Sequence, residues 1–592
     1  MSYRLEKNGD NKDIVIDGWQ NGLGDNPYGG ISDMRNVDPV SIPGEVSVAP
    51  KMLVNFTRVA ISAKTFTVDP ATEIFTWDGV GGTLTVNMAI TFSNSGGALP
   101  TGITANKAYY IKSVPSSTTF TVSAAAEGAT LDVTDAGSGT NSFTVINMGR
   151  PIRIIQSTIP YYYLTYDNNG RIWLYDNTSH QYWTYINNLS SEGSTGTSGD
   201  IISWRDYVFL LASAGLGYND LASGSLTTIT TKTNWNLTWQ SGLTGILHQA
   251  LIGQDDKVYF CNGSGVGSIS EVPTKTFDPT DSTTYTYNAL ALDIPSSDTA
   301  MCLEELGTNL LVGGQDNFIY PWDRVSPSYN FPIFCSENFI SKMVTINVTT
   351  YIFAGYKGNI YQTNGSNVSD FWKVPNHLSG TVNPYFIWKD ATFDRNKLYF
   401  GFAVTNNAGT TIDQYGGLWC VDIKTKAGWM INQMSYATYA GYVSAIGRFR
   451  GNTKITTPSA DGNGLFVGWF DGTIGGMDKG QSNPYVAGEA YVDSEMIPVG
   501  LFLDKKTIAN AEFKLVAPLV TGESVALQWR KNLTDAFTAM PITQGGDVGE
   551  LSGIAISNFD DAEWLQFRAI LTSTATNPSY VRLREIRLRI NG

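Results

Sequence analysis

The sequence predicts an all-β protein, and three observations lead to this prediction. Charged residues make up only 16% of the 592 residues, well below the roughly 25% of typical soluble proteins. Gly, Ser, Thr and Asn take their place, which suits short strands joined by tight turns. Apolar and polar residues alternate in segments such as 66–68 and 120–122, whereas helical periodicity is nearly absent. A weak repeat of turn and strand residues runs through the central half of the chain.

Residues 1–62 are expected to form an N-terminal arm and the first strands of the repeat domain. The strip DGWQNGLGDNPYGGISDMRNVDP, which starts at Asp17, is rich in turn residues and lacks strand or helix periodicity. Trp19 and Tyr28 can anchor such an arm in apolar pockets, either within the same subunit or on a neighbouring one. The alternatives are equally weighted by the sequence.

Residues 63–146 form a block rich in Thr, Ala and Gly that is expected to be a small β-module inserted into a larger domain. Its flanking segments, NFTRVAIS and GRPIRIIQS, are then expected to be neighbouring strands of that host domain.

Residues 147–480 carry the repeat, which predicts a β-propeller of six or seven blades. Most units combine a polar turn with aliphatic and aromatic residues, and two units could fall in one blade. The units are DNNGRIWLYD (167–176), SWRDYVFLLAS (203–213), GQDDKVYFCNG (253–263), GGQDNFIYPWD (313–323), YKGNIYQTNG (356–365), YGGLWCVDI (415–423) and NGLFVGWFDG (463–472).

Residues 481–592 are richer in charge and alternate more regularly, as in VALQWR and EWLQFRAIL, which predicts a C-terminal antiparallel β-sandwich. In the final VRLREIRLRI the alternation slips by one residue near Arg584 and Glu585, which indicates a β-bulge. Its arginines form a basic cluster, interpreted either as a solvated face that protects an edge strand or as an interface for acidic residues of a neighbour. They are Arg582, Arg584, Arg587 and Arg589.

The net charge of -14 excludes a basic nucleic-acid-binding surface, although an acidic wall would let a polyanion pass without sticking. The N-terminus lacks the apolar core of a signal peptide, and no stretch approaches 18 apolar residues. We therefore expect a chain that is not exported and has no membrane-spanning segment. The four cysteines are widely spaced, so we expect small buried side chains in a reducing cytoplasm: Cys261, Cys302, Cys335 and Cys420.

Several motifs resemble tail nozzle or hub proteins of short-tailed bacteriophages, the tail tubular protein B-like group. They are the turn cluster GGISDMRNVD, the C-terminal opening YVDSEMIPVGLFLDKKTIANAEFKLVAPLVTGESVALQWRKN, and the inserted block LPTGITANKAYYIKSVPSSTTFTVSAAAEGATLDVTDAGSGT. The resemblance implies a structural virion protein that is not an enzyme. It implies a ring, usually of six copies, below the portal-adaptor (the head-to-tail connector) that continues the DNA-ejection channel. Phage DNA would pass without sequence-specific binding, tail fibre or spike proteins would attach outside, and assembly would occur in the host cytoplasm.

The alternative is a propeller that binds or hydrolyses host-surface glycans, a reaction that requires an acid and a base about 5 to 9 Å apart. Candidate carboxylates are Glu304, Glu305, Asp390 and Asp394, which the sequence does not pair. TYDNNGRIW is near the Asp-box turn of sialidase-like propellers, but its Asp-to-Gly spacing is one residue too long unless Asn168 takes the Asp place.

The remaining motifs predict no catalytic, cofactor or metal site. The histidines are scattered and are expected at the surface or in turns: His180, His248 and His377. GSGVGS (263–268) precedes no helix and is expected to be a turn. Four turn aspartates lack the EF-hand pattern and are expected to be ordinary turn residues: Asp13, Asp17, Asp461 and Asp471.

Overall fold

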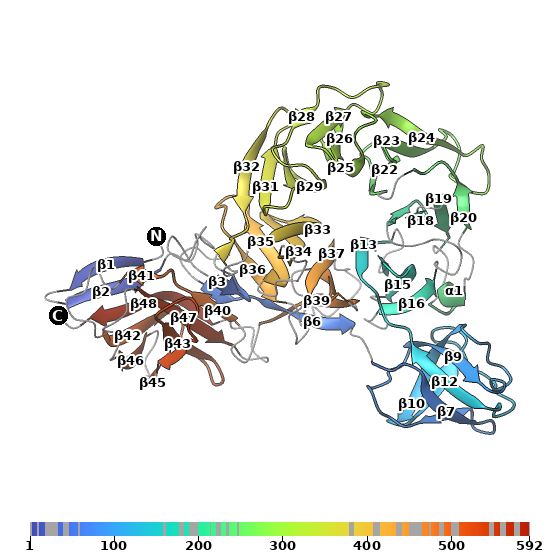
Figure 1. The fold of residues 1–592 in the computed structure, drawn as a ribbon, viewed down its shortest axis with the longest axis horizontal. Coiled ribbons are helices and arrows are strands. Elements are labelled where there is room, and N and C mark those ends of the chain that lie inside the picture. The colour runs from blue at the N-terminus through green and yellow to red at the C-terminus, as the bar shows by residue number, and fades with distance from the viewer. Residues whose placement is uncertain are drawn as a thin grey trace.

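The computed structural model confirms the all-β fold class: a propeller, a small closed barrel and a sandwich lie in one chain (Figure 1). Within the described part of the chain, α1 (Leu226–Thr231) is the single helix. The structure describes residues 3–8, 11–17, 33–38, 46–56, 60–157, 162–176, 183–188, 199–212, 215–220, 226–231, 236–244, 248–377, 384–406, 415–433, 441–448, 464–472, 475–484, 490–498, 508–540, 542–543, 550–556, 564–573 and 581–590.

The propeller has seven four-stranded antiparallel blades among the described residues. Blade 1 holds β13 (Pro151–Gln156), β14 (Tyr162–Asp167), β15 (Arg171–Asp176) and β16 (Trp183–Asn188). Blade 2 holds β17 (Asp200–Trp204), β18 (Tyr207–Ala212), β19 (Gly215–Asn219) and β20 (Asn236–Gln240). Blade 3 holds β21 (Ala250–Ile252), β22 (Val258–Cys261), β23 (Gly265–Glu271) and β24 (Tyr285–Asp293).

The second half of the propeller repeats this order. Blade 4 holds β25 (Ala300–Leu306), β26 (Asn309–Gly314), β27 (Phe318–Trp322) and β28 (Ile333–Phe334). Blade 5 holds β29 (Ile340–Ile346), β30 (Thr349–Ala354), β31 (Asn359–Thr363) and β32 (Val368–Lys373). Blade 6 holds β33 (Tyr385–Asp394), β34 (Lys397–Thr405), β35 (Gly417–Asp422) and β36 (Gly428–Gln433). Blade 7 holds β37 (Tyr442–Arg448), β38 (Leu465–Phe470), β39 (Gly475–Pro484) and β6 (Pro50–Phe56).

The ring closes because the first and last blades pack together. The innermost strands contact one another in order from β13 to β37, and β37 contacts β13 again (Figure 1). Phe466 of β38 packs against Tyr175 of β15 with ring centroids 4.7 Å apart and against Trp183 at 5.4 Å. Each of the seven repeat units lies in a different blade, so the structure fixes the blade count at seven.

The inserted module is a closed six-stranded barrel. Its strands are β7 (Lys64–Asp69), β8 (Ile74–Trp77), β9 (Ala89–Ser95), β10 (Ala108–Ser116), β11 (Thr119–Ser123) and β12 (Thr140–Val145). Alternation along these strands directs aromatic side chains inward, and Phe75 stacks on Phe120 with centroids 5.2 Å apart. Tyr110 donates a hydrogen bond to the carbonyl of Tyr185 at 2.8 Å, which fixes the barrel on blade 1.

The strands that flank the module belong to two adjoining blades of the host propeller. β6 is the outermost strand of blade 7 and pairs with β39, whereas β13 is the innermost strand of blade 1. The segment before the barrel therefore completes the last blade, and the segment after the barrel starts the first one. The barrel is inserted where the ring closes.

The sandwich is built from both ends of the chain. One sheet contains β1 (Tyr3–Asn8), β2 (Asn11–Ile16), β4 (Val37–Asp38), β5 (Val46–Val48), β42 (Ile508–Leu515), β45 (Ile542–Thr543), β46 (Glu550–Ile556) and β48 (Arg582–Ile590). The other contains β3 (Asp33–Arg35), β40 (Ala490–Asp493), β41 (Ile497–Pro498), β43 (Ser524–Arg530), β44 (Thr538–Met540) and β47 (Trp564–Thr572). Their facing apolar side chains share one core, for example Ile14, Val525, Phe567 and Leu588.

The N-terminal region therefore differs from the expected arm with first propeller strands. Among the described residues of 1–62, β1 to β5 belong to the sandwich sheets, β3 also pairs with β36 of blade 6, and β6 is a propeller strand. Strand pairing is a long-range choice that local patterns do not reveal, which explains the difference. Trp19 and Tyr28 lie outside the described residues.

β48 carries the predicted bulge. Lys514 of β42 lies opposite Glu585 and Leu515 lies opposite Leu583, so Arg584 is the extra residue. Leu583 and Ile586 consequently both face the core, and Arg584 is exposed. The bulge prediction is confirmed.

Ring closure can be tested at Gly475, the first residue of β39. A Cβ there would lie 1.7 Å from the carbonyl oxygen of Gly149, which precedes blade 1. We expect Gly475→Ala to force the two blades apart and to lower the free energy of unfolding by roughly 3 kcal/mol. Gly307→Ala is the control, since Gly307 has a φ of +59° but no atom within 4 Å of its Cβ position. It should cost only about 1 kcal/mol of backbone strain. Equal urea midpoints by tryptophan fluorescence would contradict the closure contact.

Candidate functional site

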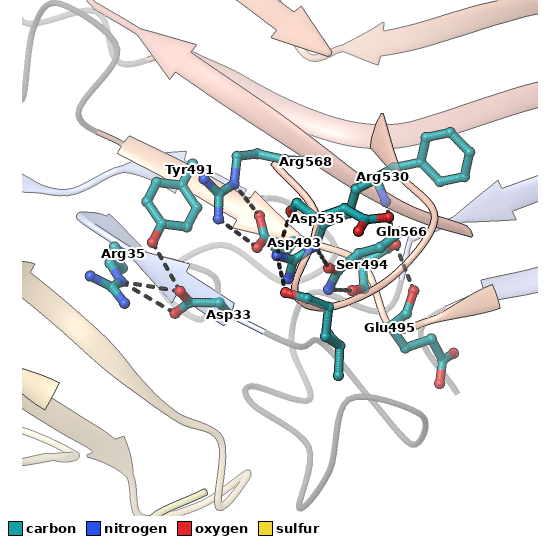
Figure 2. Close-up of polar contacts among 12 residues, drawn as sticks. Asp33, Arg35, Tyr491, Asp493, Ser494, Glu495, Arg530, Asp535, Gln566 and Arg568 are labelled. Carbon is teal, nitrogen blue, oxygen red and sulfur yellow. Dashed lines mark hydrogen bonds and ion pairs between the residues drawn. The ribbon is translucent and has the colours of Figure 1, made fainter. Parts of the chain in front are cut away.

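A buried polar network covers the outer face of the sheet formed by β3, β40, β47 and β43 (Figure 2). Along β47, Leu565, Phe567 and Ala569 face the sandwich core, so Gln566 and Arg568 project from the opposite face. The strand register places Asp493 directly opposite Arg568. Strand alternation thus gathers ionisable side chains from distant segments on one face. We call this group the junction network: Asp33, Arg35, Tyr491, Asp493, Ser494, Arg530, Gln566 and Arg568.

The centre of the junction network is a two-point ion pair. Arg568 donates from Nε and Nη2 to the two carboxylate oxygens of Asp493 at 2.6 and 2.8 Å. Its guanidinium also lies over the rings of Tyr491 and Phe537, 4.0 Å from each centroid. The planar cation is therefore held at its edge by a carboxylate and on its faces by aromatic rings.

The N-terminal strand joins this centre through Asp33. Asp33 accepts a hydrogen bond from the hydroxyl of Tyr491 at 2.9 Å and from Nε of Arg35 at 3.1 Å. β3 pairs with β40 on one side, and Arg35 is in register with Met430 of blade 6 on the other. β3 therefore connects the propeller sheet to the sandwich sheet, and the junction network holds it there.

A second arm of the network continues along the C-terminal strands. Nε of Arg530 donates to Gln566 at 2.6 Å, and the amide of Gln566 donates to the carbonyl of Ser494 at 2.9 Å. The hydroxyl of Ser494 accepts a hydrogen bond from the backbone of Phe567 at 3.0 Å. These contacts satisfy polar groups that the packed sheet removes from water.

Burial sets the electrostatics of this network. Desolvation raises the pKa of Asp493 to about 6, although the guanidinium of Arg568 opposes the rise. Burial alone would lower the pKa of Arg568, but the Asp493 carboxylate outweighs it, and the net change is a rise. Both Asp493 oxygens are engaged by Arg568, so the arrangement is suited to joining strands and not to proton transfer.

A second set of ion pairs links the inner strands of neighbouring propeller blades. Arg153 of blade 1 pairs with Asp200 of blade 2 and donates to the carbonyl of Ala250 in blade 3 at 2.9 Å. Lys342 of blade 5 pairs with Asp390 of blade 6 at 2.9 Å. Burial raises the pKa of the Asp200 carboxyl, and the positive charges of Arg153 and Lys342 oppose this rise. Charged side chains from the inner strands of blades 1, 2, 5 and 6 are thus paired across blade boundaries.

The four carboxylates considered for catalysis are not brought together as an open acid and base pair. Glu304 and Asp390 share the cation Lys342, and Glu304 also lies beside Thr345. Glu305 pairs with Arg324 and accepts from the backbone of Gln254 at 2.9 Å. Asp394 pairs with Arg448 at 2.7 Å. Each carboxylate is thus placed next to a cation.

The turn at Asp167 is a structural element. Asp167 accepts hydrogen bonds from the backbone of Gly149 at 2.8 Å and from the indole of Trp173 at 3.0 Å. The carboxylate is therefore supplied by Asp167 itself and not by Asn168. Asp298 and Glu337 similarly accept hydrogen bonds from the hydroxyls of Tyr320 and Tyr361 in blades 4 and 5. Several blades thus hold a tight turn on a buried carboxylate.

The scattered motifs have the following positions. His248 is buried and its Nδ1 lies 2.9 Å from the carbonyl oxygen of Cys261, which corrects the expectation of a surface or turn histidine. The sequence did not reveal this burial because His248 precedes the short inner strand β21. In the segment 263–268 only Gly263 and Ser264 form the predicted turn, whereas the residues from Gly265 onward already belong to strand β23. His180 and Asp461 lie outside the described residues.

All four cysteines are buried, which confirms the prediction of small buried side chains.

The C-terminal arginines do not protect an edge strand. β48 is an interior strand between β2 and β42, because the N-terminal hairpin adds outside it. Arg587 and Arg589 lie within 3.8 and 3.6 Å of the buried Asp13, and Arg589 also pairs with Glu512 at 3.5 Å. Asp17 pairs with Arg4. These charges are therefore engaged within the subunit.

The junction network was not predicted as a site, although its signal was present. Asp33 and Arg35 lie in GGISDMRNVD, and Tyr491 and Asp493 open the C-terminal motif. In the sequence, both motifs indicated a resemblance to a protein family but not that their side chains meet.

The described residues include no group of three or more His, Cys, Asp or Glu side chains placed to hold a metal ion. The six-residue α1 is too short to cross a membrane, and the described part of the chain offers no longer helix.

No protein-family model and no curated protein matches this chain. One similar solved structure is PorZ, an essential bacterial surface component of the type-IX secretion system of Porphyromonas gingivalis, at 11% identity and a TM-score of 0.33. That alignment covers 72% of this chain but only 46% of PorZ, so the chain spans less than half of its length. Another is the β-propeller domain of Cps50 (Swd1) from Myceliophteria thermophila, at 9% identity and a TM-score of 0.37, covering 56% of this chain and 97% of that domain.

The junction network can be tested by removing its central cation. Arg568→Ala leaves the carboxylate of Asp493 buried and unpaired, so we expect the free energy of unfolding of the sandwich to fall by roughly 3 kcal/mol. Arg448→Ala removes an exposed pair with Asp394 and should cost less than about 1 kcal/mol. Urea denaturation followed by tryptophan fluorescence compares the two. Equal losses would contradict a special role for the buried pair.

Glu304 should make stability depend on pH. Burial raises its pKa to about 7 from 4.5, so the folded chain binds an extra proton between these values. Its contribution to stability is therefore full below pH 4.5 and is lost as the pH rises through 7. We expect Glu304→Gln to be more stable than the parent at pH 8 by roughly 1–2 kcal/mol and to lose less stability from pH 5 to pH 8. Melting temperatures at both pH values provide the measurement. A parallel decline in both proteins would disprove this assignment.

Proposed function

We propose that this chain is a structural protein of a bacteriophage tail, a nozzle or hub subunit that acts by assembly. The observation that carries the proposal is the junction network. The two motifs that resemble tail nozzle proteins, GGISDMRNVD and the C-terminal opening, supply Asp33, Arg35, Tyr491 and Asp493 to one buried cluster. That cluster holds the strand that continues a propeller blade into the sandwich.

The barrel and the sandwich project from the propeller at different places (Figure 1). A continuous sheet from blade 6 into the sandwich resists bending between the two bodies, because bending would break strand hydrogen bonds. A channel wall that withstands DNA ejection requires such subunits. Copies of the chain would form a ring, with six copies as the expected number.

The DNA would pass through the centre of the ring of subunits and not through the propeller. The ion pairs of Arg153 with Asp200 and of Lys342 with Asp390 tie together the inner strands of neighbouring blades. The net charge of -14 supports an acidic wall, along which a polyanion slides without sequence-specific binding. The portal-adaptor would bind at one end of the ring, and tail fibre or spike proteins would bind outside it. The protein would reside in the virion after assembly in the host cytoplasm.

Glycan hydrolysis by the propeller is the weaker candidate. Glu304, Glu305, Asp390 and Asp394 each lie beside a cation and serve inter-strand contacts. A glycosidase instead needs two carboxyl groups that face each other across a cleft.

Electron microscopy of the purified chain, alone and mixed with portal-adaptor rings, tests the proposal. We expect closed rings with a central hole that cap the adaptor. Arg568→Ala should yield fewer or distorted rings because it loosens the junction, whereas Arg448→Ala should assemble as the parent does. The proposal would be overturned if the chain remains a folded monomer by mass photometry and does not bind the adaptor rings in the images.

A further inference from the structure

A pocket of about 640 Å³ opens between blades 4, 5 and 6. Its walls come from the β26–β27 turn, the segment before β29, the β30–β31 turn and the start of β33. The volume falls in the range of small-molecule sites. Neither Arg153 and Asp200 nor Lys342 and Asp390 line it, so it is separate from the ion pairs between blades described above.

Two tyrosine rings form the apolar part of this pocket. The side chains of Tyr356 and Tyr385 remain 37% and 46% exposed, and their ring centroids lie 6.5 Å apart at an angle of 58°. Phe339 packs against Tyr356 with centroids 5.2 Å apart and supports it from the side. Exposed, rigid aromatic faces of this kind offer contact area at little cost in conformational entropy.

The turn that carries Tyr356 is fixed before any ligand arrives. The buried carboxylate of Glu337 accepts hydrogen bonds from the backbone of Tyr356 at 3.1 Å and of Lys357 at 3.3 Å, and from the hydroxyl of Tyr361 at 2.6 Å. Gly355 has a φ of +67°, and a Cβ there would lie 1.9 Å from a Glu337 oxygen. A pre-formed turn lowers the entropic cost of binding.

Polar side chains complete the pocket. Asp316 and Asn338 are exposed, and no hydrogen bond of the described residues engages either side chain. A carboxylate and an amide each present two polar atoms in one plane, which can bind two adjacent hydroxyl groups. The carboxylates of Asp316 and Glu337 outnumber the single cation Lys357, so the pocket disfavours an anionic ligand.

We propose that this pocket binds a neutral pyranose sugar of a surface oligosaccharide. The apolar face of the sugar would pack on Tyr356 and Tyr385, and its hydroxyls would bind Asp316 and Asn338. Glu337 already accepts several hydrogen bonds from the protein, so the site binds sugar without cleaving it. This inference goes beyond the assembly role, because it gives one face of the propeller a capacity to recognise carbohydrate.

The test is a glycan array of neutral bacterial oligosaccharides, followed by saturation-transfer NMR and calorimetry with the array hits. We expect Tyr356→Ala and Tyr385→Ala each to weaken binding by at least about tenfold, and Asp316→Asn to weaken it less. Phe331→Ala is the matched control, since Phe331 is 92% exposed on blade 4 and does not line the pocket. It should bind as the parent does.

Two outcomes would overturn the proposal. One is that no neutral glycan binds to the folded parent chain. The other is that hits bind equally well to the two tyrosine variants, whose folding is checked by melting temperature. The assay measures sugar binding by the purified chain whether or not the chain forms rings. A negative result in the binding assay can therefore be told apart from a failure to form rings.

Discussion

The structure depends on the position of β3 between blade 6 and the sandwich. Asp33 to Arg35 pair with Tyr491 to Asp493 on one side, and Arg35 is in register with Met430 on the other. Three residues of the N-terminal region thereby join blade 6 of the propeller to the sandwich. Because β3 has only three residues, it forms few backbone hydrogen bonds, and its side chains must help to fix its position between the two sheets. The hydrogen bonds of Asp33 with Tyr491 and Arg35 supply that contribution.

Charged side chains are few and are concentrated where strands and blades meet. Only 16% of the chain is charged, yet many of these side chains are placed in buried clusters at joints. A buried charge is tolerated only when a partner is close, as for Arg568 with Asp493 and Lys342 with Asp390. Such pairs contribute to the choice of register more than to total stability, since a wrong register leaves each charge alone.

The sugar pocket and the ion-pair clusters show opposite uses of polar groups on one scaffold. In the ion-pair clusters, the carboxylates are paired with guanidinium or ammonium groups, as Asp493 is with Arg568 and Asp390 is with Lys342. In the pocket, one carboxylate, Glu337, fixes a turn, while Asp316 and Asn338 stay open beside two exposed tyrosines. Assembly and recognition would therefore occupy separate parts of the subunit. Under the two proposals, sugar binding at the propeller would leave the contacts that hold each subunit together unchanged.

Local sequence determined the strand-rich fold, the seven repeat units and the bulge at Arg584, because alternation and turn residues act over a few positions. It also indicated that the cysteines are buried. Only the tertiary structure decided that β1 to β5 complete the sandwich, that β6 closes blade 7 and that β48 is an interior strand. It alone joined Asp33 to Tyr491 and Tyr356 to Tyr385. Strand pairing and side-chain clustering depend on which surfaces meet in space, and residues separated by hundreds of positions carry no periodic signal of that meeting.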